Sequence, residues 1–266
     1  MAENTKALRT RMKSVNSTLQ LTNAMELVAS SKIRRANEAM QKAREYTAAL
    51  EKSISLLTSE KECLKSPYMR RTENPRTKII VIAGDRGLAG GYNANVFRLC
   101  NTFPDTDFIP IGKRACERFD TAINSSENFS FRDADVLADN LCRDFNEEKF
   151  DRLGVIFTRY NAVMSWDAEI KWLLPFHKSE LGSTVSTIFE PDPLTVINLS
   201  AKEYVTGILI ACLKESFACE VASRRIAMDS AGKNAKQMID DLKLQYNRAR
   251  QSAITQEITE IVAGSD

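Results

Sequence analysis

Prolines are confined to the middle of the sequence. All seven prolines lie between Pro67 and Pro193, so residues 1–66 and 194–266 contain none, and the first glycine is Gly84. Proline removes a backbone donor and glycine destabilises a helix interior, so the two proline-free ends, the first of which also lacks glycine, favour long helices. A chain of 266 residues with such different segments does not fold as a uniform globule.

The N-terminal segment carries two heptad rows that are offset by four residues. The first row contains Leu8, Val15, Thr22, Ala29, Ala36, Ala43, Leu50 and Leu57, and the second contains Met12, Leu19, Glu26, Ile33, Met40, Thr47 and Ile54. Two such rows form the a/d seam of a coiled coil. The pattern predicts one helix of about 60 residues, roughly 90 Å long, which needs a second helix along its seam.

The C-terminal segment supplies the second helix. Its rows are Met228, Ala235, Leu242, Ala249 and Gly232, Ile239, Tyr246, Ala253. Small seam residues allow two backbones to approach closely. We therefore predict an antiparallel coiled coil of residues 1–66 with 201–266, and a separate α/β domain inserted between them at 67–200.

The inserted segment alternates strand-like and helical patterns. Strands are expected at Ile79–Ala83, Phe108–Ile111 and Val155–Phe157, with a possible fourth at Val185–Phe189. Helical patterns lie between them, near Ala94–Cys100, Arg114–Thr121 and Ala134–Phe145. This alternation predicts a small, mostly parallel sheet covered by helices.

Composition excludes several functional classes. The longest apolar runs are far shorter than the ~20 residues that span a bilayer, so a soluble protein is expected. Six scattered cysteines without a CxxC motif indicate reduced core thiols, and a single histidine, His177, argues against a zinc site or a histidine-based nucleophile. We expect no catalytic constellation, no metal and no cofactor. No transit peptide precedes the first helix, which favours a bacterial protein.

Two features leave alternative functions open. The loop Gly84–Asn93 (GDRGLAGGYN) follows a strand, but its glycines do not fit GxGxxG and no P-loop lysine follows. A structural turn or contact surface is favoured there over a nucleotide-binding enzyme. The basic N-terminal helix fits a solvated face, a nucleic-acid or protein interaction module, or a surface toward an acidic partner.

The C-terminal end continues an apolar stripe almost to the last residue. Ile254, Ile258, Ile261 and Val262 form it. In an antiparallel pair this end is expected to extend beyond the start of the first helix, where no intramolecular partner covers it. Exposed apolar surface of this kind indicates a binding partner.

Four segments of the sequence resemble the gamma subunit of the rotary F-type ATP synthase. They are Leu21–Ala36 (LTNAMELVASSKIRRA), Gly84–Asn93, Lys214–Met228 (KESFACEVASRRIAM) and Tyr246–Gly264 (YNRARQSAITQEITEIVAG). The ITQEITEIVAG run is the most specific. The loop departs from the family pattern only in Ala89, where a cysteine is common. The resemblance implies a Rossmann-like domain at the base of the coiled coil.

The resemblance also implies a function without an active site on this chain. One copy would stand inside the ring of alpha and beta subunits, joined at its base to the epsilon subunit and the membrane-embedded c-ring. It would rotate and so couple proton translocation to ATP synthesis or hydrolysis on beta. Nucleic acid is not an expected partner. The expected location is the cytoplasmic face of the bacterial plasma membrane, with membrane association only through the complex.

The resemblance further implies contact residues. Polar contacts to the catch region of beta fall on Arg250, Gln251 and Thr255, with Met25 near them on the first helix. The apolar tip, Ile254, Ile258, Ile261 and Val262, would act as a non-directional bearing. A basic face toward acidic loops of beta would comprise Arg9, Lys13, Lys32, Arg34 and Arg35.

Overall fold

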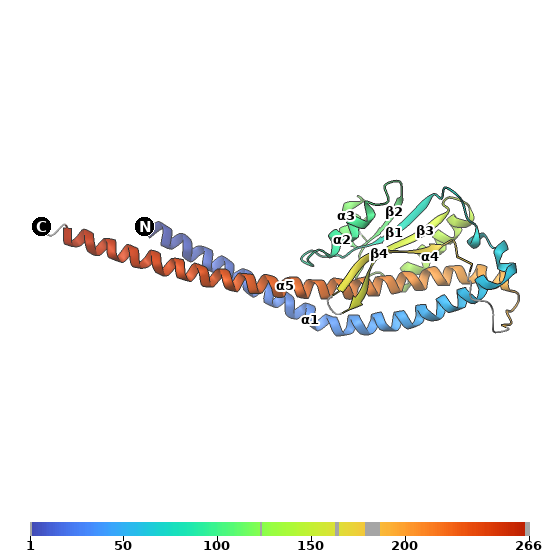
Figure 1. Ribbon diagram of the computed structural model, residues 1–266, viewed down its shortest axis with the longest axis horizontal. Coiled ribbons are helices and arrows are strands. Elements are labelled where there is room, and N and C mark those ends of the chain that lie inside the picture. The colour runs from blue at the N-terminus through green and yellow to red at the C-terminus, as the bar shows by residue number, and fades with distance from the viewer. Residues whose placement is uncertain (1, 123, 163–164, 179–186, 264–266) are drawn as a thin grey trace. The chain divides into compact units, whose positions relative to one another are not determined.

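The computed structural model describes residues 2–122, 124–162, 165–178 and 187–263 (Figure 1). Long helices stand at both ends of the chain, α1 at Ala2–Ser59 and α5 at Pro193–Ala263. Two short 3-10 helices, η1 (Lys61–Lys65) and η2 (Pro67–Met69), follow α1. The remaining elements lie between these and α5: β1 (Thr77–Ile82), α2 (Tyr92–Cys100), β2 (Asp107–Ile111), α3 (Lys113–Arg118), α4 (Phe131–Asn146), β3 (Arg152–Ala162) and β4 (Ser165–Leu174).

The chain forms two compact units. One, the two-helix unit, comprises Met1–Ser31 and Arg224–Asp266, and the other, the α/β unit, comprises Lys32–Ser223. Both α1 and α5 contribute one segment to each unit. The prediction of a long N-terminal helix is confirmed, and α5 begins earlier than the heptad pattern indicated, at Pro193. Proline suits a first helical position, and Asp192 before it caps the helix by accepting the Thr195 N–H at 2.9 Å.

The sheet of the α/β unit has the strand order β2-β1-β3-β4. β1 pairs in parallel with β2 and with β3, whereas β3 and β4 form an antiparallel ribbon. The first three strands lie where the sequence predicted them. The predicted fourth strand, Val185–Phe189, is wrong for Thr187–Phe189, which are irregular, and its other residues lie outside the described ones. The fourth strand is instead β4.

Both faces of the sheet are covered. Successive strand side chains point to opposite faces, so Ile79 and Val81 pack with α2 and α3, while Ile80 and Ile82 pack with α4 and α5. All four side chains are buried. This explains why β1 reads as a continuous apolar run, as is usual for a parallel strand inside a covered sheet.

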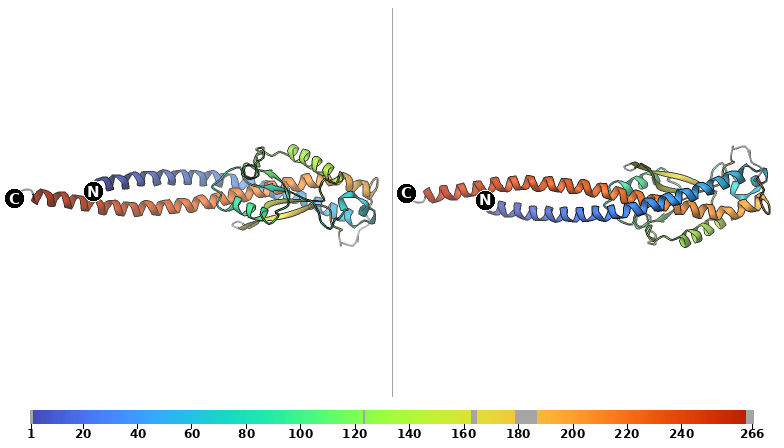
Figure 2. Two further views of the ribbon diagram at one scale, coloured as in Figure 1. Left: turned by 90° about the horizontal axis from the view of Figure 1, so that it is seen from above. Right: turned by 90° about the horizontal axis from the view of Figure 1, so that it is seen from below.

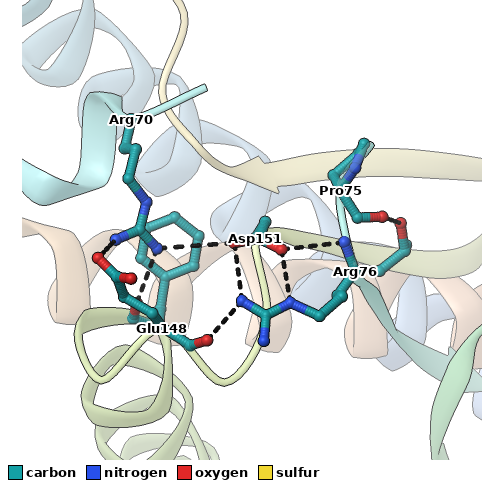
Figure 3. Close-up of polar contacts among 7 residues, drawn as sticks. Arg70, Pro75, Arg76, Glu148 and Asp151 are labelled. Carbon is teal, nitrogen blue, oxygen red and sulfur yellow. Dashed lines mark hydrogen bonds and ion pairs between the residues drawn. The ribbon is translucent and has the colours of Figure 1, made fainter. Parts of the chain in front are cut away.

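The entry of the chain into the sheet is fixed by a carboxylate (Figure 3). Asp151, just before β3, accepts the backbone N–H of Arg76 at 3.0 Å and its Nε–H at 2.8 Å. Arg76 also donates to the Glu148 carbonyl at 2.5 Å, and Arg70 pairs with the Glu148 side chain. The Arg76 hydrogen bonds, acting against burial, lower the pKa of Asp151. The connection between η2 and β1 is thereby tied to the start of β3.

Within the α/β unit, α1 and α5 pack antiparallel along their seam. Ala36 and Met40 contact Ala218. Further along α1, Tyr46 and Leu50 lie over Gly207, where a Cβ atom would come within 2.4 Å of Leu50 Cδ1. None of the helices in the described part of the chain is long and apolar enough to cross a membrane.

Candidate partner-binding surface

The two-helix unit is held together by a narrow seam. A Cβ atom placed on Gly232 would lie 3.1 Å from Asn23 Oδ1 and 3.6 Å from Thr22 Oγ1, so the helices are in close contact there. Arg225 Nε lies 3.9 Å from Glu26 Oε1. Rising numbers on α1 therefore face falling numbers on α5, which makes the pair antiparallel. The buried seam residues belong to the predicted rows: Thr22, Ala29, Met228, Ala235 and Leu242.

The C-terminal end of α5 extends past the start of α1, as predicted (Figures 1 and 2). If the register set at Gly232 continues, the first turn of α1 lies opposite α5 near Ala253, and about ten residues of α5, roughly 15 Å, lie beyond it. Ile254 is 48% exposed and Ile258 57% exposed. The side chains of Ile261 and Val262 lie outside the described residues. This end presents apolar side chains that the described part of α1 does not cover.

Polar candidates surround the two isoleucines. Arg250, Gln251 and Thr255 are all exposed. The Thr255 hydroxyl donates to the Gln251 backbone carbonyl at 3.0 Å, a bond within the helix. Residues three, four and seven apart share a helix face, so Gln251, Thr255 and Ile258 form one patch.

Met25 does not belong to this patch. It is half-buried and neighbours Glu26, which faces Arg225 on α5. Since Arg225 and Arg250 lie 25 positions apart on one helix, about 37 Å separate the two places. Met25 instead lies on a stripe with Leu21 and Val28, which are 59% and 55% exposed. Sequence reasoning missed this stripe, although Leu21 and Val28 stand out as apolar residues outside both heptad rows.

The basic candidates are divided between the units. Arg9 and Lys13 are exposed in the two-helix unit, and Arg34 and Arg35 are exposed in the α/β unit. Lys32 is engaged within the chain, because its Nζ lies 2.7 Å from Glu127 Oε1 and 6.0 Å from the centre of the Phe217 ring. Arg9 and Lys13 therefore lie one helical turn apart on α1, Arg34 and Arg35 are consecutive on the same helix, and Lys32 is tied to the loop before α4.

Hydrogen bonds to the start of α3 and to the segment before α4 hold the loop Gly84–Asn93 in place. The Asp85 carboxylate accepts hydrogen bonds from the backbone N–H groups of Lys113, Ser126 and Glu127 and from the Ser125 hydroxyl. Burial raises the pKa of Asp85, but these four hydrogen bonds outweigh it and leave the pKa lowered. Asn93 Oδ1 accepts the Gly84 N–H at 2.9 Å.

A carboxylate of α5 lies against the start of this loop. The buried side chain of Glu220 lies so close that a Cβ atom on Gly84 would come within 2.8 Å of its Cδ. The Ser223 hydroxyl donates to the Ala89 carbonyl at 2.7 Å. A carboxylate at this position repels the phosphate of a nucleotide, so the geometry opposes nucleotide binding. The contacts of Glu220 and Ser223 instead fasten the loop to α5.

Comparison with known proteins identifies the family. A family model described as ATP synthase matches residues 4–266. The chain is 37% identical to the ATP synthase gamma chain of Ruminococcus albus, covering 98% of each. The chain belongs to the ATP synthase gamma chain family. It is also 33% identical to the sodium ion specific ATP synthase gamma chain of Acetobacterium woodii, covering 100% of this chain and 99% of that one.

A solved structure supports the fold of the gamma chain. A chain of the Euglena gracilis mitochondrial ATP synthase, in an assembly described as OSCP/F1/c-ring, matches with a TM-score of 0.68 at 18% identity, covering 99% of this chain and 94% of that chain. The resemblance drawn from four sequence segments is thus confirmed, as is the class of fold. The individual contact residues remain predictions.

Proposed function

We propose that this chain is the rotating central-stalk subunit of a membrane-associated ATP synthase. The two-helix unit contacts the ring of alpha and beta subunits, and the α/β unit joins the epsilon subunit and the c-ring. Ion flow through the membrane sector turns the chain, and its asymmetry drives the beta subunits through different nucleotide affinities. The chemistry takes place on beta, and this chain carries no active site of its own.

The exposed apolar end of α5 is the feature that supports this proposal most directly. A helix that continues about 15 Å beyond its partner and exposes Ile254 and Ile258 is unfavourable in water unless another surface encloses it. Apolar contacts have little directional preference, which suits a tip that meets chemically identical neighbours in turn. One copy per complex at the cytoplasmic face of a bacterial membrane, attached only through the other subunits, fits these features.

Co-purification tests the proposal. An affinity-tagged chain expressed in its native host is expected to bring with it alpha and beta subunits, together with smaller stalk subunits and the c-ring when detergent is used. Purification of the tagged chain alone, or with nucleic acid in a salt-sensitive manner, would contradict it.

The polar patch on α5 is tested by removing one side chain. Gln251→Ala is expected to lower coupled ATP synthesis by about two- to fivefold, because it removes one polar contact to a partner. Gln41→Ala, an exposed glutamine of α1 in the α/β unit, is the matched control and should leave synthesis unchanged. Equal activity of both variants and the unaltered complex would refute the role of Gln251.

A further inference from the structure

β3 is longer than its parallel neighbour. β1 pairs with β3 from Thr77 opposite Arg152 as far as Val81 opposite Ile156, and β3 then continues to Ala162 with only β4 beside it. The edge of β3 that β1 no longer covers exposes backbone donors and acceptors inside the unit. Buried groups of this kind need other partners.

Side chains of α5 supply those partners. Ser216 Oγ accepts the Thr158 N–H at 3.1 Å, and Cys219 Sγ donates to the Thr158 carbonyl at 3.6 Å. Glu215, directly before Ser216, accepts the Tyr160 N–H through its Oε1 at 2.9 Å. All three α5 side chains are buried. One face of the helix therefore takes the place of the missing strand.

Arg44 brings α1 into the same arrangement. Its guanidinium nitrogen Nη2 donates to the Tyr160 carbonyl at 2.7 Å and to Glu215 Oε1 at 2.5 Å. Tyr160 thus has its N–H bound by α5 and its carbonyl bound by α1, while Arg44 and Glu215 bind each other. Three elements that are far apart in sequence meet at the two backbone groups of one residue.

These bonds differ in kind from the other contacts along the helices. The seam contacts of Ala36, Met40 and Ala218 are apolar and tolerate small sliding movements. The ion pair of Lys171 with Glu51 also joins β4 to α1, but it joins two side chains and involves no backbone atom of the sheet. Arg44 and Glu215 bind fixed backbone atoms with charge-assisted geometry, so they define one rotational setting of each helix against the sheet.

We propose that Arg44 and Glu215 are positioning residues that lock α1 and α5 to the sheet against twisting. This inference rests on the proposed function, since a rotor must pass torque from the α/β unit to its helices. Apolar packing holds the helices beside the sheet, and the Arg44–Glu215–Tyr160 junction fixes their angle. Its contribution is greatest when the rotor works against a load.

The experiment compares loaded and unloaded turnover of the whole complex. Arg44→Met is the principal variant, because it removes both hydrogen bonds but keeps an unbranched apolar side chain. We expect the assembly yield to stay within about twofold of that of the unaltered complex. The rate of ATP hydrolysis, measured in detergent so that the rotor turns without a load, should also stay within about twofold. ATP synthesis at a low imposed ion gradient should fall by about fivefold or more, at least the factor that the net loss of a single hydrogen bond represents.

Two further variants separate positioning from mere stability. Arg44→Lys keeps a charge near Glu215 and should recover part of the lost synthesis, whereas Lys171→Met should leave both activities unchanged. Equal loss of hydrolysis and synthesis in Arg44→Met, or no loss of either, would overturn the inference. If even the unaltered chain does not co-purify with alpha and beta subunits, the proposed function fails instead, so the two failures are distinguishable.

Discussion

α5 is packed differently in the two units that it passes through. Between Tyr204 and Ser223, in the α/β unit, nearly every side chain is buried, including the polar Ser216 and Glu220. Among the described side chains from Arg224 onward, in the two-helix unit, burial is confined to a stripe: Met228, Gly232, Ala235 and Leu242. A helix buried all round must satisfy its polar groups inside the protein, whereas a helix with one buried stripe leaves them to water.

The difference predicts that similar substitutions have unequal effects in the two units. In the α/β unit, positions are fixed by backbone contacts and internal hydrogen bonds. In the two-helix unit, most side chains can move into solvent. Three pairs of variants measure this contrast, and a fourth pair compares two positions near the end of α5 within the two-helix unit.

The largest expected effect is that of Gly112→Ala in the α/β unit. Gly112 has φ of +101°, and a Cβ atom there would lie 1.9 Å from the Ala83 carbonyl oxygen at the end of β1. Strain and displacement of the strand end together should lower the free energy of unfolding by about 3 kcal/mol or more. Urea denaturation followed by circular dichroism measures this.

Gly232→Ala is the matched variant in the two-helix unit. Its Cβ atom would meet Asn23 Oδ1 at 3.1 Å, but Asn23 is an exposed side chain that can turn away. Alanine also favours the helix over glycine by up to ~1 kcal/mol. The change in stability should be neutral or positive. A loss as large as that of Gly112→Ala would contradict the contrast between the units.

The second prediction concerns buried serine. Ser216→Ala removes the acceptor of the Thr158 N–H and leaves that donor buried without a partner, which should cost about 1–3 kcal/mol of unfolding free energy. Ser230→Ala, at an exposed position of the same helix in the two-helix unit, should change stability by less than ~0.5 kcal/mol. Similar losses of unfolding free energy in both variants would show that the packing of α5 does not differ between the two units.

Much of this contrast could be predicted from the sequence, and the reasons for the misses are physical. The absence of proline predicted α1 and most of α5, and the heptad rows predicted the seam, because helix propensity and periodicity are local properties. β4 was missed because its alternating pattern, Trp166, Ala168, Ile170 and Trp172, is typical of a half-buried antiparallel strand rather than a buried run.

The site was harder to predict than the fold. Met25 was expected near Arg250, but the antiparallel register of α1 and α5 shows that the two residues lie far apart along the two-helix unit. The junction of Arg44 with Glu215 was missed because the sequences of β1 and β3 do not show that β3 continues several residues beyond its pairing with β1. The available signal for this junction was Glu215 itself, a charged residue inside an apolar stretch of sequence.

The third prediction is a dependence on pH. The pKa of Asp85 is lowered in the folded state, so its contribution to stability is fully present above the unfolded value of about 3.9 and is lost as pH falls through the folded pKa. Asp85→Asn should cost about 1 kcal/mol at pH 7 and flatten the decline of stability below about pH 4. Asp240→Asn, an exposed residue of the two-helix unit, is the control. Identical acid profiles for Asp85→Asn and the unaltered chain would exclude this role.

The smallest expected effect on folding is that of Ile258→Ser at the end of α5. Because this side chain is already 57% exposed, its removal should change the free energy of unfolding of the isolated chain by less than ~0.5 kcal/mol. Binding should respond more strongly, because enclosing an isoleucine in a partner contributes about 1.5–3 kcal/mol. Ala253→Ser, near the last turn of the seam, should behave in the opposite way, with stability reduced more than binding. If Ile258→Ser reduced stability and left the yield of the complex unchanged, the end of α5 would be packed within the chain rather than against a partner.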